Sequence, residues 1–521
     1  MSRALFKATS LVGGMTLISR ILGFARDMVL ARYFGAGTVM DAFFVAFKIP
    51  NFMRRTFGEG AFSLAFVPVI SEYKTTREHH EVQELADRVG GTLGLVLVGI
   101  TVIGVIAAPV LVWIFAPGFS VDQSKYDLTV AMVRVTFPYL MFISLTAFAG
   151  GILNTYGKFG VPAFTPVILN IVMIAAAIWL APHLANPGMA LAWGVFIAGV
   201  LQLLFQVPFL FRLKLMPRPK FSEGHAAVKR IMKLMLPALF GSSVSQINMV
   251  VDTVIASFLA TGSVSWLYYS DRLMEFPLGV FSIALGTVIL PNMAQHFAAK
   301  SDTGFSATLD WALRLTAVVV VPAAVGLLCM SGPLLVTLFH YGQFNTQDAR
   351  MATVSLSAYA FGLLGFTLVK VFAPGFYARQ DTRTPVKIGV IAVIANILLN
   401  IMITIPWAMS GASAPHAGLA LATSLAAFLN AWLLYRGLRR LGVYTPAPGW
   451  RPLFWRVLIS NLVMGGLLWL GVGNLDVWLA RNAVHRGLWL AFWILLAFVV
   501  YFLVLFISGF RLRHLRRVQA G

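Results

Sequence analysis

The feature that most constrains this chain is a series of apolar runs, each about twenty residues long, the length at which a helix crosses the roughly 30 Å hydrocarbon core of a bilayer. Fourteen such runs can be counted, centred near residues 20, 55, 102, 140, 172, 200, 247, 282, 322, 362, 395, 427, 462 and 496. Hydrophobic residues make up 59% of the chain and charged residues 11%, which excludes a soluble globule with a polar surface. The sequence therefore predicts an all-α polytopic membrane protein with 14 transmembrane helices.

Motifs for catalysis or for ATP hydrolysis are absent from the sequence. We find no Ser/His/Asp set, Walker motif or Gly-rich phosphate loop, and the nine histidines lack metal-ligand spacing. The single cysteine, Cys329, excludes an internal disulfide. These observations favour a transporter without a cofactor over an enzyme. Its energy source would be a coupling cation or the membrane potential.

The net charge of +21 reflects Lys and Arg in the short connections between apolar runs. They are concentrated in alternate connections and at both ends of the chain, which is the positive-inside pattern and predicts both termini in the cytoplasm. The connections on the opposite side hold only a few, such as Lys125, Arg350, Arg481 and Arg486. No cleavable signal peptide is expected, because the first apolar run is long and charged.

Three short motifs recur at offsets of 219 to 230 residues and indicate an internal repeat. GAFSLAF at 60–66 returns as GVFSIAL at 279–285, GMALA at 188–192 returns as GLALA at 418–422, and the segment ending at Pro166 has a looser counterpart around Tyr377. The repeat predicts two six-helix lobes, 1–215 and 216–442, related by a pseudo-two-fold axis along the membrane normal. The second lobe begins with a basic cytoplasmic linker, and 443–521 adds two further helices.

The most unusual apolar run extends from Met40 to Tyr73. It carries five charges, at Asp41, Lys48, Arg54, Arg55 and Glu59. Charges at bilayer depth are costly, so those that are retained usually face a wet cavity and mark a substrate or ion path. A spacing of seven places Asp41, Lys48 and Arg55 on one helix face. This run is therefore predicted to form one wall of a polar cavity.

Two further runs are predicted to line the same cavity. The first contributes Arg20, Arg26 and Asp27, and the eighth contributes Asp271, Arg272 and Glu275, so that the three runs hold six cations and five anions. Because the planar fork of arginine matches phosphate oxygens, the excess favours an anion-binding cavity. The alternative is that pairs such as Arg55 with Glu59 and Arg272 with Glu275 serve only helix packing.

Two other features of the polar runs suggest function. Pro50, Gly58 and Gly60 interrupt the second run and predict a hinge, although a kink needed only for packing is equally consistent with them. Asp252 and Asp381 are candidates for a coupling-cation site, and the alternative for each is a snorkelling or loop-capping carboxylate.

Long motifs of this chain resemble the MurJ (MviN) family of lipid II flippases, within the multidrug/oligosaccharidyl-lipid/polysaccharide (MOP) exporter superfamily. They are SRILGFARD at 19–27, DAFFVAFKIPN at 41–51, RR at 54–55, EGAFSLAFVP at 59–68, GSVSWLYYSDRLMEFPLGVFSIALGTVILP at 262–291 and APGFYARQDTRTPVKI at 373–388. The resemblance implies a fourteen-helix flippase of the inner membrane that moves undecaprenyl-diphosphate-linked peptidoglycan precursor to the periplasmic leaflet by alternating access.

The resemblance also implies residue roles. Family arginines needed for function match Arg20, Arg26, Arg54 and Arg272, and the accompanying cavity charges of the family match Asp41, Lys48, Arg55 and Glu275. The polar runs themselves add Asp27, Asn51 and Glu59 to the predicted substrate-binding set. The last two helices are expected to form a groove for the polyprenyl tail. Some members bind sodium in the second lobe, but Tyr377 stands where a further ligand oxygen would help Asp381.

The partners implied by the resemblance are lipid II, membrane lipids and cell-wall synthesis proteins. Three other functions stay open. A cation-coupled drug exporter, or an exporter of another polyprenyl-linked oligosaccharide, would share the superfamily. A membrane scaffold for cell-wall synthesis would need no polar cavity.

Overall fold

The computed structural model describes residues 3–56, 62–218, 220, 226–299 and 301–511, and its account of side chains leaves out 3–10, 236–238, 240–245 and 280–288. In this part of the chain the secondary structure is helical and contains no strand. A helix satisfies its backbone hydrogen bonds within one segment, which a bilayer requires. The predicted all-α fold class is thereby confirmed.

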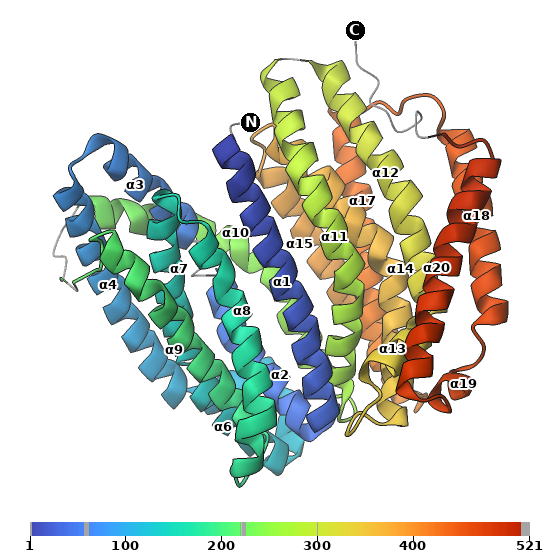
Figure 1. The fold of residues 1–521 in the computed structure, drawn as a ribbon, viewed down its shortest axis with the longest axis horizontal. Coiled ribbons are helices and arrows are strands. Elements are labelled where there is room, and N and C mark those ends of the chain that lie inside the picture. The colour runs from blue at the N-terminus through green and yellow to red at the C-terminus, as the bar shows by residue number, and fades with distance from the viewer. Residues whose placement is uncertain (1–2, 57–61, 219, 221–225, 300, 512–521) are drawn as a thin grey trace. The chain divides into compact units, whose positions relative to one another are not determined.

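The chain divides into two compact units, Met1–Ser265 and Trp266–Gly521. The first contains α1 (Arg3–Phe34), α2 (Thr38–Met53), α3 (Ser63–Thr76), α4 (His79–Ile106), α5 (Ala108–Phe115), η2 (Pro117–Val121), α6 (Gln123–Thr136), α7 (Tyr139–Thr155), α8 (Gly160–Ala175), η3 (Ala176–Leu180), η4 (Ala181–His183), α9 (Met189–Arg212) and α10 (Ala226–Ser257). Within it α1 packs along α8, as Figure 1 shows.

The second unit takes in most of α11 (Ser263–Ala298) and the helices that follow it. These are α12 (Asp302–Cys329), α13 (Ser331–Phe339), α14 (Thr346–Tyr377), α15 (Arg383–Leu399), η5 (Asn400–Thr404), α16 (Ile405–Met409), α17 (His416–Arg440), α18 (Trp450–Gly471), α19 (Leu475–Leu479) and α20 (Ala483–Ile507). The red helices α18 and α20 lie side by side in Figure 1, and α18 also packs on α12.

Ten of the described helical segments are long and apolar enough to cross a membrane. They coincide with ten of the fourteen predicted runs, so the multi-pass architecture is confirmed. The other four runs, near residues 20, 55, 247 and 282, coincide with α1, with α2 and α3, with α10 and with α11. Three of these four are the most polar runs of the sequence. The total of fourteen spans stays a prediction.

Three helix starts repeat along the chain with an offset that lies within the range of the sequence motifs. The helix α4 begins at His79 and α12 at Asp302, α5 begins at Ala108 and α13 at Ser331, and α8 begins at Gly160 and α15 at Arg383; each difference is 223 residues. The helices α8 and α15 both continue into a π-helical segment, η3 and η5. These correspondences support two copies of one helical plan. The lobe boundaries predicted above stay a prediction, and α10 packs within the first compact unit.

Helix starts and cores in both units follow from the local sequence. The side chains of Glu78 and Glu81 form a capping box at the start of α4, and Asn345 and Asp348 form another at the start of α14, which satisfies backbone N–H groups that would otherwise lack partners. The first unit has a hydrophobic core cluster that includes Phe62, Phe66 and Phe148. The second has a cluster that joins α11, α12, α14 and α17.

Candidate functional site

Arg26 and Asp27 lie buried between α1 and α8. The guanidinium of Arg26 donates to the Asp27 carboxylate at 2.6 and 2.9 Å and to the amide oxygen of Asn170 at 3.1 Å. Asn170 in turn donates to the backbone oxygen of Ser19. Arg26 is 5% exposed and Asp27 1% exposed. In this conformation the pair joins α1 to α8, and neither side chain is open to a large ligand.

Arg20 differs from this pair although it is on the same helix. Its side chain is exposed. Arg20 and Asp27 are seven residues apart and so lie on one helix face, but the packing of α8 covers the part of α1 that holds Asp27 and leaves Arg20 accessible. Arg20 is thus better placed than Arg26 to meet an anion.

Asp41 is the centre of a buried hydrogen-bond network in the first unit. One carboxylate oxygen accepts from the Lys125 ammonium and the Gly262 N–H, both at 2.8 Å, and the other accepts from the Ser265 N–H at 3.0 Å and its hydroxyl at 2.7 Å. The side chain is 1% exposed. Since four donors engage its two oxygens, Asp41 joins α2 to α6 and to the segment after α10. We therefore do not carry it into the proposed binding set.

The charges of α2 become more accessible toward its carboxyl end. Lys48 is half-buried and donates to the Thr253 hydroxyl of α10 at 3.0 Å. Arg54 donates to the Asn51 side chain at 3.1 Å, and Arg55 is exposed. Along the predicted face, exposure therefore increases from the buried Asp41 through the half-buried Lys48 to the exposed Arg55.

The described part of the second apolar run contains two α-helices. The helix α2 ends at Met53, residues 54–56 are π-helical, and α3 begins at Ser63. Pro50 is buried in the last turn of α2. Gly58, Glu59 and Gly60 lie outside the described residues, so the predicted pair of Arg55 with Glu59 and the hinge stay predictions.

Arg272 on α11 is half-exposed and has two acceptors on its own helix. It donates to Glu275 at 2.9 Å and to the Tyr268 hydroxyl at 3.2 Å, and its guanidinium lies 5.2 Å from the centre of the Tyr268 ring. The side chains of Arg272 and Glu275 are 36% and 46% exposed. The pairing considered from the sequence is thereby observed. Tyr268 orients the guanidinium while the ion pair stays accessible.

The two carboxylates considered for a coupling cation lie far apart in sequence. Asp381 accepts from the Thr384 N–H at 3.0 Å just before α15. Hydrogen bonds from the Thr384 side chain and backbone hold the pKa of Asp381 below its usual range. Asp252 is half-buried on α10. Within the described ranges no three His, Cys, Asp or Glu residues are grouped as metal ligands, and the cation site stays a prediction.

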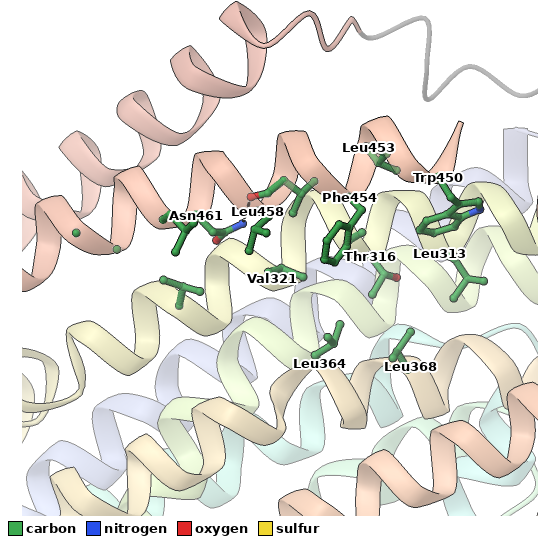
Figure 2. Close-up of a pocket in the computed structure, with 16 residues that line it drawn as sticks. Leu313, Thr316, Val321, Leu364, Leu368, Trp450, Leu453, Phe454, Leu458 and Asn461 are labelled. Carbon is green, nitrogen blue, oxygen red and sulfur yellow. Dashed lines mark hydrogen bonds between the residues drawn. The ribbon is translucent and has the colours of Figure 1, made fainter. Parts of the chain in front are cut away.

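A long apolar groove lies in the second unit between α12, α14 and α18. Its volume is about 600 Å³, and along α18 it runs from Trp450 to Gly466, about 24 Å of helix. Figure 2 shows Leu313 and Thr316 of α12 opposite Trp450 and Phe454 of α18. The polar side chains of Thr316 and Asn461 donate to backbone oxygens of their own helices. The groove therefore offers a mainly apolar surface, suited to a hydrocarbon chain.

Sequence reasoning missed several residues that the structure brings into these networks. Lys125, counted among loop cations, is 5% exposed and bonded to Asp41. Asn170 accepts a hydrogen bond from Arg26. Its only signal in the sequence was that of an amide side chain within an apolar run, which is weak. Arg486, another cation of the cation-poor side, is 6% exposed and donates to backbone oxygens of Trp478 and Leu479. The available signal was the position of Lys125 and Arg486, because both occur in connections where Lys and Arg are otherwise rare.

Comparison with known proteins assigns the chain to a family. The family model described as "Lipid II flippase MurJ" matches residues 30–488. A probable lipid II flippase MurJ of Haemophilus influenzae is 46% identical over 514 residues, which cover 96% of this chain and 99% of the relative. Lipid II flippase MurJ of Burkholderia cenocepacia is 42% identical over 520 residues, with 98% and 99% covered.

Solved structures agree with this assignment. The structure of lipid II flippase MurJ in an inward closed conformation superposes with a TM-score of 0.80 at 28% identity, covering 97% of this chain and all of the other. An inward-facing MATE transporter of the MOP superfamily superposes with a TM-score of 0.66 at 13% identity, covering 85% and 99%, which shows a shared fold alone. The chain belongs to the MurJ family of lipid II flippases.

Proposed function

We propose that this chain is a transporter that moves lipid II, the undecaprenyl-diphosphate-linked peptidoglycan precursor, from the cytoplasmic to the periplasmic leaflet by alternating access. The observation that carries the proposal is that the chain has accessible arginines in the predicted polar runs and, in the second unit, a long apolar groove. These features match the two parts of an anionic lipid, because guanidinium groups bind diphosphate oxygens and an apolar groove receives the hydrocarbon tail.

The arginines contribute unequally to this proposal. Arg20 is exposed, Arg54 is half-buried, and Arg272 is 36% exposed on its side chain. These three supply the guanidinium groups for the diphosphate, with Lys48 and Arg55 as further cations. Arg26 acts through its bonds to Asp27 and Asn170, which hold α1 on α8. The polyprenyl tail occupies the groove of α12, α14 and α18 and extends from it into lipid.

We further propose that the membrane potential drives part of the cycle. A potential of 100 mV contributes about 2.3 kcal/mol for each elementary charge moved across the membrane. Because the cell interior is negative, the potential favours outward movement of an anionic headgroup. A coupling cation at Asp252 or Asp381 is the other source considered. Dissipating the potential in proteoliposomes, with sodium held constant, separates the two.

The termini and the protein partners are also part of the proposal. The basic connections support a cytoplasmic location of both termini. A reporter that is active only in the periplasm, fused after residue 521, should therefore stay inactive. Cell-wall synthesis proteins that consume the flipped precursor are the proposed partners in the membrane.

The decisive experiment is translocation of fluorescent lipid II by the purified protein in proteoliposomes. Lipid II should become accessible to a headgroup-modifying enzyme on the opposite side. Depletion in the host should trap lipid II in the inner leaflet and lead to lysis. Unchanged precursor movement after depletion would refute the proposal.

A further inference from the structure

Asp310 forms a buried junction at one end of the apolar groove. One of its carboxylate oxygens accepts from the Trp450 indole at 2.7 Å, the Tyr444 hydroxyl at 2.9 Å and the Ala447 N–H at 3.2 Å. The other oxygen accepts from Arg314 at 2.6 Å. Asp310 is 4% exposed. Such an arrangement compensates a carboxylate that burial would otherwise destabilise, and it fixes the positions of all four donors.

The junction attaches a loop to α12. Residues 441–449 connect α17 to α18, and Asp310 and Ser306 both bind this loop, the latter through Thr445. Arg314 also donates to the Ala447 and Pro448 oxygens. Burial, and then the Asp310 carboxylate, raise the pKa of the Tyr444 hydroxyl well above its usual range. The start of α18 is thereby held at a defined distance from α12.

Trp450 is both a donor in this junction and a wall of the groove. Its indole N–H points to Asp310, the Arg314 guanidinium lies 5.4 Å from the centre of its ring, and the ring lines the end of the groove beside Leu313 (Figure 2). A buried indole needs an acceptor for its N–H. Asp310 supplies that acceptor and so sets the orientation of the ring.

The opposite end of the two added helices is also attached to the rest of the unit. Arg486, which is 6% exposed, donates to the backbone oxygen of His340, in the segment between α13 and α14, at 3.3 Å. Since both ends are fixed, the groove is formed before a ligand enters. A preformed site reduces the ordering cost of binding.

We propose that Asp310 is a positioning residue for the lipid tail: it holds Trp450 across the end of the groove and so determines where the polyprenyl chain is bound. The inference rests on the proposed function, in which the tail of lipid II occupies this groove. Asp310 touches no part of the lipid, and it acts through the indole ring.

The test compares two ligands on the full-length protein in lipid nanodiscs. One is lipid II with its undecaprenyl tail, and the other is the same headgroup diphosphate esterified to a methyl group. The dissociation constant of the methyl ester divided by that of lipid II measures the preference for the tail. Loss of the charge-assisted bond in Asp310→Asn or Trp450→Phe should lower this ratio about tenfold, with the affinity for the methyl ester unchanged.

Two matched variants separate positioning from stability. Tyr444→Phe removes another donor from the same carboxylate oxygen without changing the groove lining, so it should lower Tm and keep the ratio. Trp455→Phe changes an exposed indole of α18 that does not line the groove, and it should alter neither quantity. Trp450→Phe keeps an aromatic ring and leaves Asp310 with three donors, so it tests the inference even if Asp310→Asn fails to fold.

Each other outcome identifies what is wrong. If Asp310→Asn and Trp450→Phe lost affinity equally for both ligands, the junction would have a purely structural role and the inference would be overturned. The same holds if the variants keep the full preference for the tail. An unaltered protein that binds both ligands equally would refute the tail groove, and one that binds neither would refute the proposed function itself.

Discussion

The carboxylate of Asp41 and the ammonium of Lys125 lie 2.8 Å apart, and their side chains are 1% and 5% exposed. The Lys125 ammonium also lies 4.1 Å from the centre of the Phe119 ring and 3.4 Å from the Thr261 hydroxyl. A buried ion pair contributes to stability only when further hydrogen bonds satisfy both charges. Here both partners have them, so the pair joins α2, α6 and the segment after α10.

Replacing Lys125 by Ala should destabilise the protein strongly. The variant leaves the Asp41 charge buried, and removing one partner of a buried pair costs several kcal/mol; we expect about 3 kcal/mol because the Gly262 and Ser265 donors remain. Thermal unfolding in detergent, followed by intrinsic fluorescence, should show a clearly lowered Tm.

The matched control is Arg77→Ala, which breaks the exposed pair of Arg77 with Glu81. Exposed pairs contribute less than about 1 kcal/mol, so this variant should unfold close to the unaltered protein. Equal Tm values for Lys125→Ala and Arg77→Ala would show that the buried pair of Asp41 and Lys125 contributes no more to stability than an exposed pair.

Arg272→Lys should impair transport although it keeps the positive charge. An ammonium has no planar fork, so it loses the paired contact to diphosphate oxygens, and we expect the initial rate to fall at least about tenfold. Arg272→Ala should abolish translocation while the protein still inserts. The measurement is fluorescent lipid II movement in proteoliposomes at matched protein density.

Arg350→Lys provides the control for this substitution. Arg350 also pairs with a carboxylate, Asp476, and is also well exposed, but it lies outside the proposed set. It should transport at the normal rate. Full activity of Arg272→Lys would mean that transport requires only a positive charge at this position and not the planar guanidinium.

Much of the fold follows from apolar periodicity, because a run long enough to cross a bilayer has few alternatives to a helix. The segments that composition recognises least, such as α1 and α2, are those that carry charges. Within one helix the pairing of Arg272 with Glu275 could be foreseen, since residues three apart share a face. The spacing of the charges alone could not show which residues of the predicted set are buried in contacts between helices.

Contacts between distant segments set the limit of the sequence analysis. Lys125 meets Asp41 from 84 residues away, and Trp450 meets Asp310 from 140 residues away. Helical spacing says nothing about such partners, because they depend on which helices pack together. The tail groove is predicted on the last two helices, and one of them, α18, lines the apolar groove together with α12 and α14. Which surface holds the tail stays a prediction.

Acidification should destabilise the second unit through His340. Burial first, and then the nearby Arg486 guanidinium, lower the pKa of His340, while Asp348 acts in the opposite direction. The unfolded chain therefore binds the proton more readily than the folded one. Stability from this group is complete above the ordinary value of about 6.5 and falls as the pH decreases through it.

The measurement is Tm between pH 7.5 and 5.5, about one unit on either side of the ordinary histidine value. His340→Asn should show a smaller decrease over this interval than the unaltered protein. His183→Asn, at an exposed histidine on η4, serves as the control and should keep the full decrease. An unchanged pH response in His340→Asn would remove His340 as its source.

Gly466→Leu should block the groove without disturbing the packing around it. A Cβ built at Gly466 meets no atom within 4 Å, although the residue lines the groove. The leucine side chain can therefore occupy the space proposed for the tail, and we expect the preference for tailed lipid II over its methyl ester to fall about tenfold. Gly99→Leu on α4, where a Cβ also meets nothing, should keep the preference. Undiminished preference in Gly466→Leu would place the tail elsewhere on the protein.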